Sequence, residues 1–187
     1  MGFTAKMYAV LIMMMMDGLA TAIYSSEVTK LVPSDTAPDM VDKMAGITMI
    51  SLGVGSVIGG FISGVIADKK GGLFAGRLGL VFWVLCCACF VSALQWESMW
   101  MAQVAGFMWG FAMFYLEGWL YTVISRNYGG VAEGFSVNKQ FHSWFYLFFQ
   151  VAVFVTDNEL PLKLLITFLG VASVPAVVMM NKIPHIR

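Results

Sequence analysis

Six long apolar runs fill most of this chain, and they constrain its fold more than any motif does. The runs are Met7–Tyr24, Gly46–Ala67, Leu78–Leu94, Met99–Tyr121, Phe135–Thr156 and Leu164–Met180. Each has close to, or more than, the about 20 residues with which a helix crosses a bilayer core of about 30 Å. Because lipid offers the backbone no hydrogen bonds, such segments are expected to be helices. The sequence predicts an all-α polytopic membrane protein, with six transmembrane helices in a single membrane domain over residues 1–187.

The composition favours a membrane protein over the soluble alternative, a helical bundle that is apolar on all sides. Hydrophobic residues make up 59% of the chain and charged residues 12%, whereas about 25% of the residues in a soluble domain are charged. Six helices of this kind would have almost no polar surface to cover them in water. The sequence also has no basic surface suited to nucleic acid, so no nucleic-acid partner is expected.

The basic residues that flank the runs predict on which side of the membrane the two ends lie. With six crossings both ends share one side. That side carries Lys6, Lys69, Lys70, Arg77, Arg126, Lys139, Lys182 and Arg187, and the other side carries Lys30, Lys43 and Lys163. By the positive-inside rule, both ends are expected in the cytosol, or in the matrix if the membrane is the mitochondrial inner membrane. The longest connection, Ser25–Ala45, is expected to be a loop on the opposite side.

Small residues within the runs predict where helices pack closely. Glycines at a spacing of four residues let two helix backbones approach, which favours association in lipid. The expected packing glycines are Gly55, Gly59, Gly60, Gly64, Gly106 and Gly110. We expect them to pack helices of this one chain; a surface that docks another protein is the alternative.

A short polar segment between the second and third runs carries a recognisable motif. It consists of Gly64, Asp68, Lys69, Lys70 and Gly72, with Arg77 following. The segment resembles the loop motif of the major facilitator superfamily, Gly-x-x-x-Asp-(Arg/Lys)-x-Gly-(Arg/Gly), which joins two helices on the cytosolic side. The acid is suited to a helix end, and the basic residues are suited to the anionic inner leaflet. An ordinary basic loop is the alternative interpretation.

Three further stretches extend this resemblance to the Unc-ninety-three-like branch of the superfamily. The first run reads Met-Asp-Gly-Leu-Ala over 16–20, the fourth reads Trp-Gly-Phe-Ala over 109–112, and the fifth has Phe135, Lys139 and Ser143 at four-residue spacing. In this order they are similar to the carboxy-terminal six helices of that branch, from about Met16 to Met180. The resemblance implies half of a twelve-helix bundle, whose substrate site lies between the halves. It also implies relatives that regulate or escort other membrane proteins.

Four polar side chains within the apolar runs are candidates for a function at membrane depth. Asp17 and Glu117 are acids inside runs, where a carboxylate is costly and by default indicates ion pairing or proton coupling. Lys139 and His142 are expected in the same layer as Glu117, so a Glu117–Lys139 or a Glu117–His142 pair is predicted. The alternatives are a structural ion pair for Glu117 and a hydrogen bond to a neighbouring helix for Asp17.

The residue patterns favour a protein that is not an enzyme. They include no catalytic set, metal-binding box or phosphate-binding loop, so no cofactor or metal is predicted. Cys86, Cys87 and Cys89 in the third run are expected to be small packing residues. The favoured function is an accessory or regulatory subunit that packs against other integral membrane proteins and lipids in a larger complex. The alternative is a secondary transporter in which a second copy of the chain completes the cavity.

Overall fold

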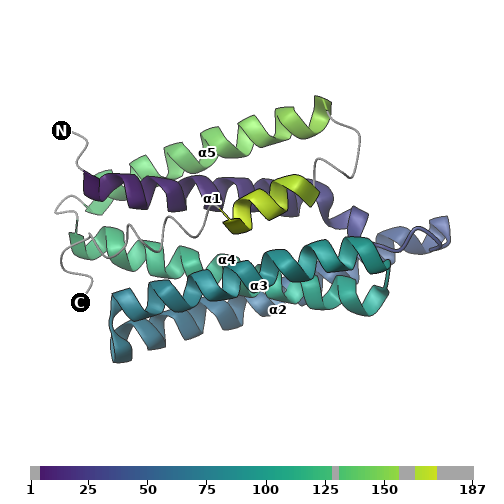
Figure 1. Ribbon diagram of the computed structural model, residues 1–187, viewed down its shortest axis with the longest axis horizontal. Helices are drawn as coiled ribbons and strands as arrows, with labels where there is room; N and C mark the ends of the chain where they lie inside the picture. The colour runs from purple at the N-terminus through teal and green to yellow at the C-terminus, as the bar shows by residue number, and fades with distance from the viewer. Residues whose placement is uncertain (1–4, 128–130, 156–162, 172–187) are drawn as a thin grey trace.

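The computed structural model describes residues 5–127, 131–155 and 163–171, and all of the secondary structure in them is helical (Figure 1). The elements are α1 (Ala5–Glu27), the short 3-10 helix η1 (Val28–Leu31), α2 (Pro38–Lys70), α3 (Gly72–Trp96), α4 (Met99–Asn127) and α5 (Val131–Val155). Residues 163–171 form a further helical segment. The prediction of an all-α protein is therefore confirmed for these residues.

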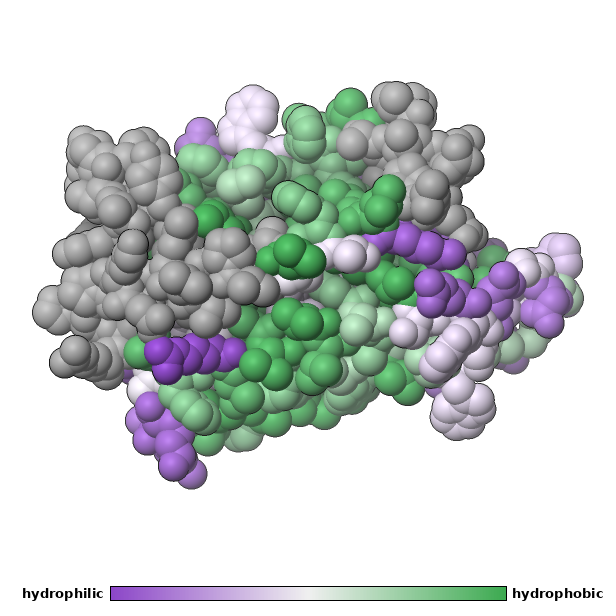
Figure 2. All heavy atoms as spheres, in the orientation of Figure 1, coloured by the Kyte–Doolittle hydropathy of each residue, from purple (hydrophilic) through white to green (hydrophobic). Residues whose placement is uncertain are grey.

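Three of the described helices are long and apolar enough to cross a membrane. They are α2, α3 and the Met99–Arg126 part of α4. The outer face of α2 carries large exposed apolar side chains, such as Ile50, Val57 and Phe61. Figure 2 shows apolar side chains over the middle of one face of the molecule and hydrophilic ones towards the two ends of its long axis. The chain is therefore a membrane-associated protein, and three of the six predicted spans meet this criterion within the described residues.

The helix boundaries differ most from the prediction before Gly46. The expected loop Ser25–Ala45 is mostly helical, because α1 continues to Glu27, η1 follows and α2 already begins at Pro38. Proline suits a helix start, where its missing N–H leaves no bond unmade, and Asp39 in the first turn suits the positive end of the helix dipole. α2 is therefore 33 residues long, and its first two turns are a polar extension of the predicted span.

The helices pack in two groups that meet along α4. α4 makes its most extensive contacts with α2 and then α3, whereas α1 packs mainly on α5. Figure 1 shows α5 at the edge of the bundle beside α1, on the opposite side from α2 and α3. The core between the groups contains the fully buried indoles of Trp83, Trp109 and Trp119. The segment 163–171 packs on α3, since Gly170 approaches the side chain of Cys87.

Glycines bring α2 and α4 into backbone contact. A Cβ added at Gly110 would lie 2.1 Å from the carbonyl oxygen of Leu52, and one at Gly59 would lie 2.2 Å from that of Phe111. Gly55 and Gly106 lie in the same contact, so four of the predicted packing glycines lie where two backbones meet. At Gly55, Gly59 and Gly110, where the nearest atom is a backbone carbonyl oxygen, a side chain would require the two helices to separate.

Gly60 and Gly64 differ from the other predicted packing glycines. A Cβ at either of them would meet nothing within 4 Å. The buried face of α2 contains Thr48, Leu52, Gly55, Gly59, Ser63 and Ala67. Gly60 and Gly64 fall outside this face, so a side chain at either position would not meet α4.

Candidate intramembrane polar site

The first part of the candidate site is a contact between a carboxylate of α1 and an imidazole of α5. Nδ1 of His142 lies 2.8 Å from Oδ2 of Asp17, and the two side chains are 18% and 7% exposed. A Cβ at the adjacent Gly18 would lie 2.5 Å from the carbonyl oxygen of His142. Because Gly18 has no side chain, the backbone of α5 approaches α1 closely enough for the pair to form. His142 thus contacts Asp17 rather than Glu117, which corrects the predicted Glu117–His142 pair.

The second part is a cluster between α4 and α5. Nζ of Lys139 lies 3.3 Å from Oε1 of Glu117, and the two side chains are 57% and 14% exposed. The hydroxyl of Tyr121 donates a hydrogen bond to the same carboxylate oxygen, and Nζ of Lys139 lies 5.6 Å from the centre of the Tyr121 ring. The structure therefore brings together Glu117 and Lys139, one of the two pairs considered from the sequence.

The two parts adjoin at a small cavity. Asp17 and Glu117 both line a cavity of about 20 Å³, together with apolar side chains and the indole of Trp83. Two carboxylates, one ammonium group and one imidazole therefore lie close together in this part of the bundle.

The residues of the loop motif lie at the end of the bundle where α2 meets α3. Asp68, Lys69 and Lys70 form the exposed last turn of α2, and Asp68 lies 3.5 Å from Arg126 of α4. The carbonyl oxygen of Gly72 accepts a hydrogen bond from Nε1 of Trp119, at 2.6 Å. Within the described residues the motif thus connects the α2–α3 turn to α4. Of its other members, Gly64 lies on the open side of α2, and Arg77 is exposed on α3.

Two residues of this region were not predicted from the sequence. Tyr121 lies four residues after Glu117, a spacing that places both on one helix face and could have indicated their contact. Asn138 of α5 is fully buried, and its amide has no hydrogen-bond partner among the described residues. Asn138 lies four residues before His142, so the same spacing puts it on the face of α5 that carries the Asp17 pair.

Within the described residues, no group of three or more histidine, cysteine or acidic side chains could hold a metal ion. Cys86 and Cys87 are buried in α3 and Cys89 is half-buried. All three are free thiols, and Cys87 packs on Gly170. The cysteines therefore occupy packing positions in the described part of the chain.

Comparison with known proteins adds no family to this geometry. No protein-family model matches the chain, and a search of curated proteins finds no match. The functional argument therefore depends on the residues of the site and on the faces of the bundle.

Proposed function

We propose that this chain is a non-enzymatic integral membrane subunit, the six-helix half of a major-facilitator-type bundle. It packs against other membrane proteins and lipids within a larger complex. In this proposal α1, α5 and the sixth apolar run cross the membrane beside the three more apolar helices. The exposed Lys69, Lys70 and Arg126 lie at one end of the bundle, which supports a cytosolic or matrix location for that end.

An internal repeat supports the half-bundle part of the proposal. The proposed half divides into two units of three helices, α1 to α3 and α4 to the sixth apolar run. α4 packs on α2 and α1 packs on α5, so the first helix of each unit packs on the second helix of the other. Both carry the pattern Met-x-Gly-x-Ala, over 16–20 and 108–112, and the two helices run in opposite directions (Figure 1). Inverted units of three helices are the building blocks of major facilitator halves.

The observation that carries the subunit role is a polar strip on the outer face of α5. The Lys139 side chain is 57% exposed, and Gln140 and Ser143 are exposed beside it. With Trp144 and Leu147 they line an open groove of about 460 Å³. At about 1.5 Å per residue, these polar residues lie about 12–18 Å along the helix axis from the start of α5, which places them near the bilayer centre if α5 crosses the membrane. A charged group at the bilayer centre costs about 2.5–3.5 kcal/mol or more, so a protein that supplies hydrogen-bond acceptors covers this strip better than lipid does.

The test compares what contacts two outward faces in the native membrane. A photo-crosslinking residue replaces Trp144 on α5 in one variant and Val81 on α3 in the other; these side chains are 64% and 54% exposed. After gentle extraction, we expect crosslinks from position 144 to a different membrane protein and crosslinks from position 81 to lipid. The mass of the uncrosslinked complex, measured by native mass spectrometry, should exceed that of two copies of the chain. Lipid crosslinks from both positions, with the mass of a single copy, would exclude the subunit role.

A second candidate function, a secondary transporter built from two copies, is favoured by the charged pairs themselves. Asp17–His142 and Glu117–Lys139 bring four ionisable groups together, and both carboxylates line the cavity inside the bundle, as a proton-coupled site requires. In this case position 144 crosslinks to a second copy, and the native mass equals two chains. Proteoliposomes of that dimer should then take up protons after a pH jump, and the Asp17→Asn variant should not.

A further inference from the structure

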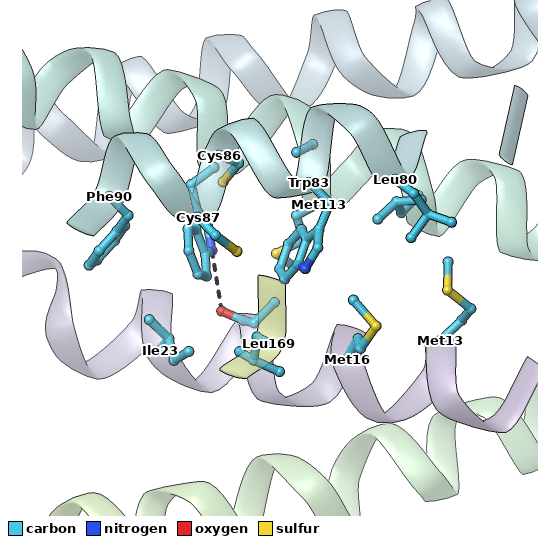
Figure 3. Packing of buried hydrophobic residues seen from close by; sticks show 14 of the residues in the cluster. Met13, Met16, Ile23, Leu80, Trp83, Cys86, Cys87, Phe90, Met113 and Leu169 are labelled. Carbon is cyan, nitrogen blue, oxygen red and sulfur yellow. Dashed lines mark hydrogen bonds between the residues drawn. The ribbon is translucent and has the colours of Figure 1, made fainter. Parts of the chain in front are cut away.

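The cavity beside Asp17 and Glu117 contains a hydrogen-bond donor with no acceptor. Trp83 of α3 is 1% exposed, and its Nε1 has no partner within the described part of the chain. Figure 3 shows its indole between α3 and α1, with the nitrogen directed towards α1 and Met16. A buried donor without a partner costs about 1–3 kcal/mol. A polar atom in the cavity would remove this cost.

The two carboxylate residues that line the same cavity each have two acceptor oxygens. Oδ2 of Asp17 contacts His142, and Oε1 of Glu117 accepts hydrogen bonds from Tyr121 and Lys139. These hydrogen bonds involve one oxygen of each carboxylate, so the second oxygen, Oδ1 of Asp17 or Oε2 of Glu117, can accept from a further donor. The residues that carry these groups, Trp83 of α3, Asp17 of α1 and Glu117 of α4, line one small cavity.

We propose that this cavity binds one water molecule, which accepts a hydrogen bond from Nε1 of Trp83 and donates one hydrogen bond each to the carboxylates of Asp17 and Glu117. The volume of about 20 Å³ exceeds the about 10–15 Å³ that a water requires, and three hydrogen bonds are usual for a buried water. The remaining lining residues are apolar: Met13, Met16, Ala20, Met113, Leu116 and Leu120.

A metal cation fits the same space poorly. A hard cation requires about six oxygen ligands, whereas two carboxylates line this cavity. The indole N–H of Trp83 is a donor only and would point its positive hydrogen at the ion. A water satisfies both kinds of group at once. It joins the Asp17–His142 and Glu117–Lys139 pairs into one hydrogen-bonded network, and this conclusion does not depend on the subunit or the transporter role.

The water can be detected at the indole itself by NMR of the full chain in lipid nanodiscs. Trp96, Trp100 and Trp144 are exposed, so we replace all three by Phe and leave three indole signals. The further variants W109F and W119F then assign these signals, because each removes one of them. We expect magnetisation transfer from water to the Trp83 indole proton, with opposite signs in NOESY and ROESY spectra, as for a bound water. Trp109 and Trp119 are matched controls, because each donates to a backbone carbonyl, at 3.3 and 2.6 Å. Neither control should show transfer.

Two results would overturn the proposal. A Trp83 indole without transfer, like that of Trp109, would mean that the cavity is dry. Transfer with the same sign in both spectra would mean proton exchange with bulk solvent rather than a bound water. Both readings come from protein whose cavity residues are unchanged, so a variant that fails to fold does not affect them.

Discussion

The contacts of α2 with α4 and of α1 with α5 both bring two backbones together, but their side chains differ. In the α2–α4 contact, glycines on both helices form the interface, and a Cβ at Gly55 or Gly110 would lie 2.1 Å from a carbonyl oxygen. In the α1–α5 contact, Gly18 alone lies against the backbone of His142, and the Asp17–His142 pair lies beside it. One contact is therefore held by close packing, and the other combines packing with charge.

The comparison is informative because Gly18 and Gly110 occupy the same place in the Met-x-Gly-x-Ala patterns of α1 and α4. The residue before the glycine is Asp17 in α1 and Trp109 in α4. Trp109 donates a hydrogen bond to the carbonyl oxygen of Ala20, 3.3 Å away, and so connects α4 to α1. The same position of the pattern thus carries a structural residue on α4 and an ionisable residue on α1, and the other three ionisable residues of the site lie on α4 and α5.

The largest expected effect comes from removing one partner of the α1–α5 pair. His142→Ala leaves the carboxylate of Asp17, which is 7% exposed, without its partner, and loss of one member of a buried pair costs about 3–5 kcal/mol. Unfolding by SDS, followed by circular dichroism in mixed micelles, measures this loss. The double variant Asp17→Asn/His142→Ala removes the unpaired charge and should recover part of the stability. Equal losses in the single and double variants would show that packing, rather than charge, holds this contact.

A smaller loss is expected in the α2–α4 contact for Gly110→Ala. Its Cβ would require the backbones to separate, and overpacking of this kind costs about 1–3 kcal/mol. Gly60→Ala is the matched control, because its Cβ meets nothing within 4 Å and alanine favours a helix over glycine by about 0.5–1 kcal/mol. The same SDS titration should therefore show Gly110→Ala less stable than the parent and Gly60→Ala equal or more stable. The opposite order would contradict the assignment of the buried face of α2.

These glycines also show how much of the helix packing can be predicted from the sequence. The four-residue spacing predicted Gly55 and Gly59 as packing residues, but it also predicted Gly60 and Gly64, which occupy another face of α2. A four-residue spacing of glycines can occur on any face of a helix. The position of α4 decides which face of α2 is buried. The helix start at Pro38, in contrast, had a local signal in the proline and the following acid, and the prediction missed it because it followed hydropathy alone.

The partner of His142 illustrates the same limit at the site. Four candidate residues were found from their charge inside apolar runs, and the structure places all four around one region of the bundle. The pairing of Glu117 with Lys139 was predictable, because these residues lie on α4 and α5, which are consecutive in the sequence. Asp17 and His142 are 125 residues apart, and their contact depends on which face of α1 packs on α5. The cavity at Trp83 likewise depends on three helices at once and has no local signal.

A still smaller effect on stability is expected for Glu117→Gln. The Lys139 side chain is 57% exposed, so losing its ionic partner costs about 1 kcal/mol or less, while the glutamine still accepts the hydrogen bond of Tyr121. The SDS titration should place this variant well above His142→Ala in stability. Gln140→Ala, which changes an exposed neighbour of Lys139, serves as a control for general effects on α5. A loss as large as that of His142→Ala would mean that the two pairs contribute equally to the fold.

The smallest effect on stability is expected outside the apolar core, where the turn between α3 and α4 meets the segment before α2. The Ser34 hydroxyl and the Ser34 backbone N–H both donate to the carboxylate of Glu97, and these hydrogen bonds lower the pKa of Glu97 below its usual 4.5. A lowered folded-state pKa means that this contribution is complete above about pH 4.5 and is lost as the pH falls through the folded pKa. The amide NMR signal of Ser34 should therefore shift with a midpoint below pH 4.5. In Glu97→Gln, which keeps an acceptor and loses the ionisable group, the signal should stay constant over this range, and a midpoint that survives the substitution would assign the titration to another group.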